Sequence, residues 1–198
     1  MIIADVVATK LSSNYFDIII PRKLGAPYNE ELAIGAVMED GTTYLNDEVV
    51  RTLGILQEYI DKVKLEQIQE IKRRTSLYRS GATSSNTDYS KLLGVLEQNN
   101  NRTIILVDDG AATGATLIAA ARHIKQKYIP KRLIIAIPVA PKDTVNLLKK
   151  EAADHVEVIT SPPTSQFKSV GQYYQSFEPV TDEQVIEIMK KRKLSSLL

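Results

Sequence analysis

The sequence predicts an α/β fold in which helices flank a mainly parallel sheet. Residues 103–107 and 132–137 are short apolar runs of the kind that form buried strands, and residues 114–127 between them have the spacing of a helix. A strand, a helix and a second strand in this order join parallel neighbours through a right-handed crossover. With 198 residues, of which 43% are hydrophobic, the chain is long enough to bury one substantial core.

The elements predicted in the first part of the chain are short. Residues 2–11 place Ile, Val and Leu side chains at helical spacing, and the apolar run 15–21 ends near a proline, which indicates a buried strand. Residues 33–38 and 42–45 predict two strands on either side of an Asp-Gly turn. Asp47 is expected to cap a short helix that ends near residue 54.

The rest of the chain adds helices, one more strand and two irregular stretches. Their predicted ranges are a helix over 57–74, a candidate flexible flap over 80–88, a short helix over 89–96, a helix over 142–152, a strand over 156–159, an irregular stretch over 162–177 and a last helix over 182–192. The flap consists of small and polar residues, which cannot bury enough apolar surface to become ordered. Thr181 and Gln184 form a capping box that starts the last helix.

Composition excludes several classes of protein. The absence of cysteine excludes disulfides, thiolate zinc sites and cysteine nucleophiles, and the two histidines, His123 and His155, are too few for a histidine metal site. A net charge of +1 gives no indication of a nucleic-acid-binding protein. The sequence has no apolar run of about 18 residues and no secretory signal, so we expect a cytoplasmic protein without a membrane partner.

A loop of small residues follows the strand predicted at residues 103–107. The residues with little or no side chain are Gly110, Ala111, Ala112, Gly114 and Ala115. Thr113 and Thr116 add hydroxyl donors, and a helix begins directly after the loop. Because such a backbone can turn closely around an anion and direct its N–H groups inward, the loop favours phosphate binding. Ligands of open parallel sheets bind beyond the carboxyl ends of the strands, where this loop lies.

Two acids, Asp108 and Asp109, lie between the strand and the loop. Carboxylates repel phosphate, so they fit another part of the ligand, such as vicinal ribose hydroxyls, and they can help to hold a hydrated Mg²⁺. The alternative is an ordinary strand end at which Asp109 caps the helix. The loop is not a Walker loop, since Ala115 replaces the lysine, and it lacks the dinucleotide-binding pattern Gly-x-Gly-x-x-Gly.

The run Val107-Asp-Asp-Gly-Ala-Ala-Thr-Gly-Ala-Thr116 resembles the phosphoribosyl pyrophosphate (PRPP) motif of the type I phosphoribosyltransferases. The resemblance extends over most of the chain to a prokaryotic subgroup, through segments similar to residues 21–27, 31–36, 77–79, 138–141 and 167–174. It implies a type I phosphoribosyltransferase-like fold with a small hood and a flexible flap. We expect one domain over residues 1–198, with its core at about 1–25 and 100–160 and hood or flap elements at about 26–99 and 161–198.

The resemblance implies a role for each part of the motif. Asp108 and Asp109 would bind the ribose hydroxyls of PRPP and, through water, Mg²⁺. The residues that would hold the 5′-phosphate are Gly110, Ala111, Ala112, Thr113, Gly114, Ala115 and Thr116. Arg22 and Lys23, after the strand expected at residues 16–20, would be catalytic residues that contact pyrophosphate, whose developing charge needs cationic stabilisation. Solvated surface charge is the alternative for this basic pair.

Aromatic and apolar residues near the C-terminus are the candidates for the acceptor site. Phe167, Val170 and Tyr174, together with Tyr173, occupy the place where purine-specific relatives surround the base, and aromatic faces stack on nucleobases. Core packing is the alternative role for each of them. The candidate flap at residues 80–88, with Arg79 at its edge, would exclude water from the site, and a plain connection is its alternative.

Two departures from the family pattern affect these expectations. Some purine-specific relatives place a third aspartate where this chain has Ala111-Ala112-Thr113, so specificity for 6-oxopurines loses support. Members of the subgroup also begin with a strand and a glycine-rich pyrophosphate loop ahead of the helix that opens this chain. We therefore expect that translation starts about 30–40 residues before Met1. The rival expectation is a naturally shortened, non-catalytic protein that pairs with another subunit.

The predicted function is that of a Mg²⁺-dependent phosphoribosyltransferase of nucleotide metabolism, and we expect a homodimer. A nitrogen of a nucleobase-like acceptor would displace pyrophosphate from PRPP, with the protein supplying position and electrostatics. Two alternatives stay open. One is a PRPP- or nucleotide-binding regulator without turnover, and the other is a phosphatase or hydrolase that acts on a phosphorylated sugar.

Overall fold

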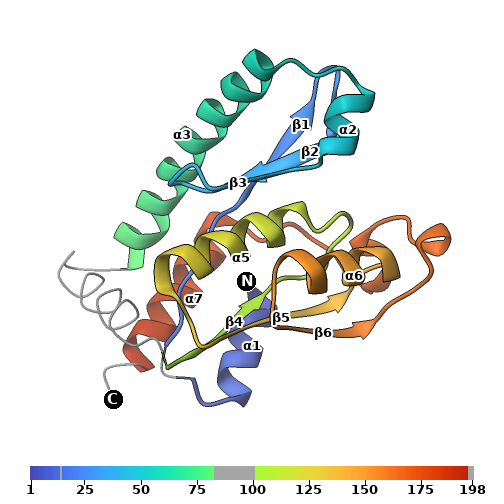
Figure 1. The fold of residues 1–198 in the computed structure, drawn as a ribbon. Coiled ribbons are helices and arrows are strands. Elements are labelled where there is room, and N and C mark those ends of the chain that lie inside the picture. The colour runs from blue at the N-terminus through green and yellow to red at the C-terminus, as the bar shows by residue number, and fades with distance from the viewer. Residues whose placement is uncertain (14, 83–100, 196–198) are drawn as a thin grey trace.

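The computed structural model describes residues 1–13, 15–82 and 101–195, and its strands form two separate sheets (Figure 1). The parallel sheet has three strands in the order of the sequence: β4 (Thr103–Val107), β5 (Arg132–Val139) and β6 (His155–Thr160). The helices that connect these strands and cover one face of the sheet are α5 (Ala115–Tyr128) and α6 (Lys142–Glu151). The predicted α/β fold with a parallel sheet flanked by helices is confirmed.

The central strand β5 holds the core of the parallel sheet. Every second side chain along it is buried, and Leu133 and Ile135 are fully buried. Both pack in one cluster with Ile118 of α5 and Leu148 of α6. Fully burying such a side chain contributes about 1.5–3 kcal/mol. The parallel register places Leu106 of β4 opposite Ile135, so the carboxyl ends of β4 and β5 lie side by side.

An antiparallel sheet forms the hood, which we define as residues 22–56 and which lies over α5 (Figure 1). Its elements are β1 (Arg22–Ala26), β2 (Asn29–Val37), β3 (Thr43–Leu45) and α2 (Asp47–Thr52). The long helix α3 (Gln57–Ala82) packs Ile60 and Ile71 against Leu24 and Ile34 of this sheet. The strand pair predicted around the Asp-Gly turn is confirmed, although β2 already begins at Asn29.

The hood is attached to α5 through the turn between β2 and β3. The Thr42 hydroxyl donates to Oε1 of Gln126 at 3.2 Å, and Arg122 donates from Nη1 to the backbone oxygen of Thr43 at 3.3 Å. Both partners on the helix lie outside the hood, so these contacts fix its position on the parallel unit.

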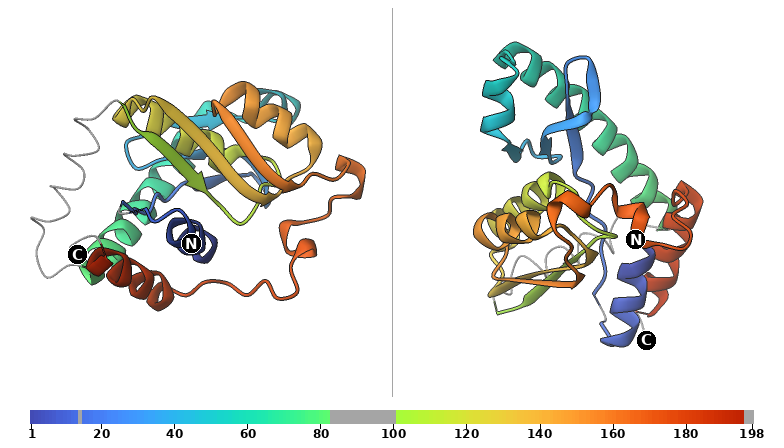
Figure 2. Two further views of the ribbon diagram at one scale, coloured as in Figure 1. Left: turned by 90° about the horizontal axis from the view of Figure 1, so that it is seen from below. Right: turned by 90° about the vertical axis from the view of Figure 1, so that its right-hand side faces the viewer.

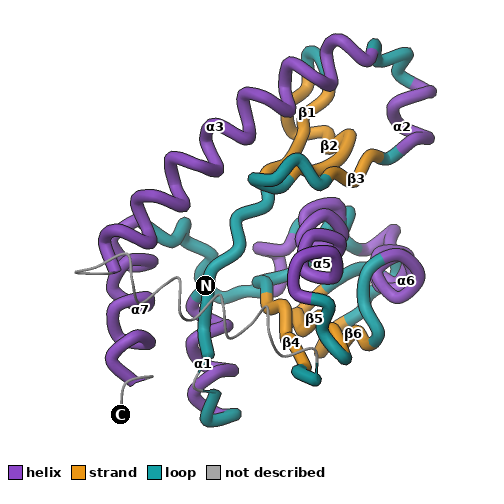
Figure 3. The backbone as a smooth tube through the Cα atoms, turned by 60° about the vertical axis from the view of Figure 1, so that its left-hand side comes forward, coloured by secondary structure: helices purple, strands orange, loops and turns teal. Residues whose placement is uncertain are grey.

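Helices from the two ends of the chain lie side by side on the β4 side of the parallel sheet (Figure 2, Figure 3). They are α1 (Ile2–Lys10) and α7 (Asp182–Ser195). Lys191 and Arg192 of α7 both bind the carboxylate of Asp5 in α1, with the lysine nitrogen at 3.1 Å. At the start of α7 the Thr181 N–H donates to Gln184 Oε1 at 2.9 Å and the Gln184 N–H donates to Thr181 Oγ1 at 3.3 Å, so the predicted capping box is confirmed.

The prediction of a strand over residues 15–21 is wrong. These residues pair with no strand in the part of the chain that the structure describes. Ile18 packs against α3 and α7, Ile19 against the core of the parallel sheet, and Ile20 against the hood. An apolar run that crosses between clusters of side chains looks like a buried strand, because hydrophobicity reports burial and not backbone pairing.

Two predicted helix ends are also corrected. Asn46, and not Asp47, caps α2: its Oδ1 accepts the N–H of Val49 at 3.2 Å, and Asp47 is the first helical residue. Helix α3 continues past residue 74 to Ala82, because Leu77 and Tyr78 pack against α7. The flap beyond residue 82 and the helix expected at 89–96 lie outside the described residues. No helix within the described ranges combines the length and apolarity needed to cross a membrane.

Candidate functional site

The loop of residues 108–114 leads from the carboxyl end of β4 to the start of α5 (Figure 1). Its first half is attached to the neighbouring strand β5. The N–H of Asp108 donates to the oxygen of Ala136 at 3.4 Å, and the N–H of Ala111 donates to the oxygen of Val139 at 3.0 Å. The loop therefore lies at the carboxyl end of the parallel sheet, where ligands of such sheets bind.

Two glycines allow the loop to pack tightly at this place. A Cβ atom at Gly110 would lie 2.8 Å from a methyl group of Val170 and 2.9 Å from the backbone oxygen of Val139, which is too close for a side chain. Gly114 has a φ of +76°, a left-handed conformation that residues with a side chain rarely adopt. A Cβ there would also meet Thr144 and Leu148 of α6 at 3.2 Å.

The loop presents backbone donors without an acceptor. Within the described residues, no hydrogen bond is made by the N–H groups of Gly110, Ala112, Thr113, Gly114 and Ala115. The side-chain hydroxyls of Thr113 and Thr116 likewise have no partner there, and Thr113 is exposed. Backbone donors are nearly always paired in folded proteins, and a row of free ones at a helix N-terminus attracts an anion. Phosphate, with its several acceptor oxygens, fits this row.

The acidic pair beside the loop is electrostatically strained. The N–H of Asp109 donates to Oδ1 of Asp108 at 3.0 Å. Burial, together with the charge of Asp109, raises the pKa of Asp108 to about 6, although that hydrogen bond and the positive amino terminus of the chain act in the opposite direction. A carboxylate in this environment is stabilised by a hydrogen-bond donor or a cation.

The same pair is the candidate magnesium site. Within the described residues, no group of three or more His, Cys, Asp or Glu side chains forms a metal site. Mg²⁺ often binds through one or two carboxylates, with water and substrate phosphates as its other ligands. The two adjacent carboxylates, one of them with its pKa raised by burial and by the other's charge, fit a cation bound in this way.

A segment near the C-terminus covers the loop. It contains two short 3₁₀ turns, Thr164–Gln166 and Val170–Tyr173. The Tyr174 hydroxyl donates to the backbone oxygen of Asp109 at 2.5 Å, and Val170 lies against Gly110. Burial raises the pKa of Tyr174, and the charges of Asp109 and Asp108 raise it further, so this hydroxyl keeps its proton as a donor.

The aromatic residues of this segment pack in pairs. The rings of Phe167 and Tyr173 stack at 5.8 Å with an interplanar angle of 19°, and those of Tyr174 and Phe177 lie 4.9 Å apart. Two of the predicted base-binding residues, Val170 and Tyr174, thus contact the loop, and the third, Phe167, stacks on a neighbour. Their role toward an acceptor stays a prediction.

The two predicted pyrophosphate-binding residues lie in the hood. Arg22 donates from Nε to Oε1 of Gln67 in α3 at 2.8 Å, and the Lys23 nitrogen lies 3.2 Å from the Glu31 carboxylate. They begin β1 and do not follow a strand at residues 16–20, because no strand forms there. In the described part of the chain neither side chain makes a hydrogen bond or an ion pair with the loop of residues 108–114, so their role also stays a prediction.

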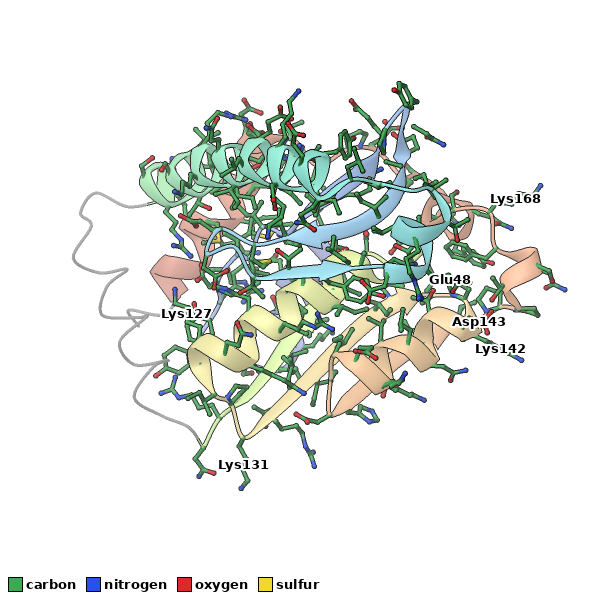
Figure 4. All side chains as sticks on the ribbon, turned by 45° about the horizontal axis from the view of Figure 1, so that its top comes forward. Glu48, Lys127, Lys131, Lys142, Asp143 and Lys168 are labelled. Carbon is green, nitrogen blue, oxygen red and sulfur yellow. The ribbon has the colours of Figure 1, made fainter. Side chains whose placement is uncertain are left out.

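Sequence reasoning missed one residue that holds the loop. Thr144 is 6% exposed, and its hydroxyl donates to the backbone oxygen of Ala112 at 2.6 Å. It lies in the first turn of α6, which begins at Lys142 and Asp143 (Figure 4). A threonine in the first turn of a helix has an ordinary local explanation, and the sequence carries no signal that its partner is 32 positions away.

A cavity of about 450 Å³ lies away from the loop, between the hood and helices α5 and α6. Its charged lining is already paired in part: Arg122 lies 3.3 Å from the Glu151 carboxylate and stacks on the ring of Tyr44, with its guanidinium carbon 5.2 Å from the ring centre. These contacts attach the hood to the helices. The free donors and the strained carboxyl group are at the loop, which we therefore take as the site.

Comparisons with known proteins identify the family of the chain. Residues 22–175 match the family model described as "Phosphoribosyl transferase domain". Two proteins of Mycobacterium tuberculosis, from strains CDC 1551 / Oshkosh and ATCC 25618 / H37Rv, are named "Putative phosphoribosyl transferase" and are each 34% identical to this chain over 175 residues. The match covers 88% of this chain and 36% of each relative, so the chain spans about a third of their length.

One solved structure is similar to this chain in both fold and sequence. The crystal structure of TT1426 from Thermus thermophilus is similar with a TM-score of 0.68 and 34% sequence identity. The match covers 96% of this chain and 82% of that one, which includes both the parallel sheet and the hood.

Proposed function

The chain belongs to the phosphoribosyl transferase domain family, and from this premise we propose that it transfers the 5-phosphoribosyl group of PRPP to a nucleobase-like acceptor. Pyrophosphate is the second product. The observation that carries the proposal is the row of free N–H groups at residues 110 and 112–115 directly beside Asp108 and Asp109. This juxtaposition suits a ligand that carries a phosphate group and neutral hydroxyls a few ångströms apart.

The loop and the acidic pair would bind different parts of the ligand. The backbone N–H groups and the hydroxyls of Thr113 and Thr116 would hold the 5′-phosphate, helped by the N-terminus of α5. Asp108 and Asp109 would accept hydrogen bonds from the two ribose hydroxyls, and they would hold Mg²⁺ through water. Bound there with pyrophosphate, Mg²⁺ would supply positive charge that stabilises the leaving group.

The chemistry itself needs mainly position and charge. A nitrogen of the acceptor would form a bond to C1 of the ribose as the bond from C1 to the pyrophosphate oxygen breaks, with the electron pair leaving on pyrophosphate. No acid stands at residues 111–113, so this part of the loop holds no group to take the proton of the acceptor nitrogen. The protein would therefore act by orienting the two substrates and stabilising developing charge.

Arg22 and Lys23 are the proposed cationic contacts of pyrophosphate. The ion pair of Lys23 with Glu31 is exposed, and pairs of this kind contribute about 0–1 kcal/mol. Exchanging Glu31 for a multiply charged pyrophosphate would therefore cost little. Arg22 is held by a neutral glutamine, which leaves its charge uncompensated by that contact.

The direct test is a pyrophosphate-release assay with PRPP, Mg²⁺ and a panel of nucleobases. We expect release that depends on both PRPP and one acceptor class, and the matching nucleotide as the second product. Asp109→Ala should abolish this release, and Asp61→Ala, which removes an exposed carboxylate of α3, should leave it unchanged.

The second candidate is a regulator that binds PRPP without turnover. Within the described residues, Arg22 and Lys23 make no hydrogen bond or ion pair with the loop, and this observation favours the second candidate. Tight PRPP binding without pyrophosphate release for any acceptor would support this candidate. Release of inorganic phosphate without an acceptor would instead indicate a hydrolase.

A further inference from the structure

Two side-chain hydroxyls, one from α6 and one from the C-terminal segment, fix carbonyl groups of the loop. Tyr174 of the C-terminal segment donates to the Asp109 oxygen at 2.5 Å, and Thr144 of α6 donates to the Ala112 oxygen at 2.6 Å. The partners are 65 and 32 positions apart in the sequence, so both bonds are tertiary contacts. Neither carbonyl belongs to a helix or a strand, and each hydrogen bond therefore sets a peptide orientation that secondary structure leaves free.

Each bond also sets the direction of a donor. In a trans peptide the C=O of one residue and the N–H of the next point in opposite directions, and every peptide bond described here is trans. Because the Asp109 oxygen points toward Tyr174, the Gly110 N–H points away from Tyr174. Fixing the Ala112 oxygen toward Thr144 turns the Thr113 N–H away from α6. Both N–H groups belong to the row without an acceptor in the described chain.

We propose that Tyr174 and Thr144 are positioning residues that orient the anion-binding N–H groups of the loop. Neither hydroxyl would donate to the bound anion, because each already donates its proton to a loop carbonyl. Their effect is to hold donors in place before the ligand arrives, so that no reorganisation is needed on binding. The identity of the bound anion rests on the proposed function, whereas the ordering of the loop by these two hydroxyls does not.

The surroundings favour orientation over simple packing. Thr144 is almost completely buried. Its methyl group faces Gly114, the residue of the loop that has a left-handed backbone conformation. Tyr174 packs its ring on Phe177, so removal of the hydroxyl alone leaves the aromatic contact intact. Phenylalanine at 174 and valine at 144 therefore delete the hydrogen bonds and keep most of the volume.

Matched variants separate orientation of the loop from simple packing. Tyr174→Phe and Thr144→Val remove the hydroxyls that bind the loop. Tyr28→Phe removes an exposed tyrosine hydroxyl in the turn between β1 and β2, and Thr144→Ser keeps a hydroxyl at the same position. Two quantities are measured for each protein: the heteronuclear NOE of the amides at residues 110–116 without ligand, and the dissociation constant of PRPP with Mg²⁺ by calorimetry.

We expect Tyr174→Phe and Thr144→Val each to lower the NOE values of the loop and to weaken PRPP binding roughly 10-fold, the effect of one lost hydrogen bond. Tyr28→Phe and Thr144→Ser should match the wild type in both quantities. If the wild type binds no PRPP, the proposed function fails, but the NOE values still test the positioning role. Loop NOE values and PRPP affinity that are the same in Tyr174→Phe and Thr144→Val as in their controls would overturn it, even if the thermal midpoint fell.

Discussion

His123 of α5 and Asp40 of the hood form a short hydrogen-bonded pair, with Nδ1 of the imidazole 2.7 Å from Oδ2 of the carboxylate. His123 is only 8% exposed, and Asp40 lies in the turn between β2 and β3. Burial alone would raise the pKa of Asp40, but hydrogen bonds from Thr42 and His123 outweigh it and hold the pKa below its usual value. The ionised carboxylate thus ties the hood to the helix that starts at the loop.

Asp40→Asn should loosen this attachment. Because the Asp40 carboxylate is 44% exposed, its charged hydrogen bonds are partly screened, and we expect the free energy of unfolding at neutral pH to fall by about 1 kcal/mol. A lowered folded-state pKa means that this stability is present above about pH 4 and is lost as the pH falls through the folded-state value. Urea denaturation at neutral pH and near pH 3 measures both effects. Glu39→Gln, at an exposed neighbouring position, is the control, and a deficit that persists at low pH would contradict the account.

Asp108→Asn should stabilise the protein without ligand near pH 7. Burial first, and the charge of Asp109 second, raise the pKa of Asp108 from 3.8 to about 6. At 1.36 kcal/mol per unit, ionisation in the folded state then costs about 2–3 kcal/mol.

The sign of the pH dependence follows from the raised pKa. The contribution of Asp108 to stability is complete below about pH 4 and is lost as the pH rises through about 6. The wild type should therefore lose stability between pH 5 and pH 7 relative to Asp108→Asn, which has no such proton to release. Thermal unfolding at both pH values measures this difference. Parallel pH profiles for the two proteins would show that Asp108 is not strained in this way.

Asp109→Ala should fold like the wild type and lose affinity for PRPP. The hydrogen bonds that Asp109 makes to Asp108 and Tyr174 use its backbone N–H and oxygen, so removal of the side chain leaves them intact. A charged hydrogen bond contributes about 1.5–3 kcal/mol, so we expect binding to weaken about 10- to 100-fold. Calorimetric titration with PRPP and Mg²⁺ measures this change, and Asp61→Ala is the control. An unchanged affinity would contradict the proposal that the acidic pair binds the ribose hydroxyls.

Gly114→Val should be more damaging than Thr113→Ala. At a φ of +76° a β-branched residue is strained by roughly 1–3 kcal/mol, and its side chain would press on Leu148 and Thr144. Thr113 is exposed, and its replacement by alanine removes one hydroxyl donor only. We expect Gly114→Val to lower the thermal midpoint and to abolish PRPP binding, and Thr113→Ala to weaken binding alone. Equal dissociation constants would argue against a backbone cradle.

Much of the parallel unit could be predicted from the sequence because its signals are local. The strand at residues 103–107 agrees with β4 at both ends, since an apolar run bounded by polar residues indicates a strand. Of its residues only Leu106 is buried, so the expected burial is confirmed for that side chain alone. The capping box at Thr181 has both of its partners within three positions. The loop of small residues after two acids likewise lies in one continuous stretch of chain.

The features that sequence reasoning missed depend on contacts between distant positions. Residues of the run 15–21 are partly buried against three separate clusters of side chains, and nothing in the run's own pattern distinguishes that from a strand. Helix α3 extends to Ala82 because α7, more than 100 positions away, covers Tyr78, whose hydroxyl donates to Asp182 at 2.5 Å. Thr144 and Tyr174 bind loop carbonyls that no local rule connects with them.

The central claim is that PRPP binds at the loop of residues 108–114 and its adjoining helix start, and amide NMR during a titration with PRPP and Mg²⁺ tests it most directly. We predict that the signals of Gly110, Thr113 and Gly114 shift and saturate together, because their free N–H groups would donate to the phosphate oxygens. Signals around the cavity between the hood and the helices, such as those of Tyr44 and Arg122, should stay in place. Saturable shifts at the cavity with no change at the loop would contradict the account.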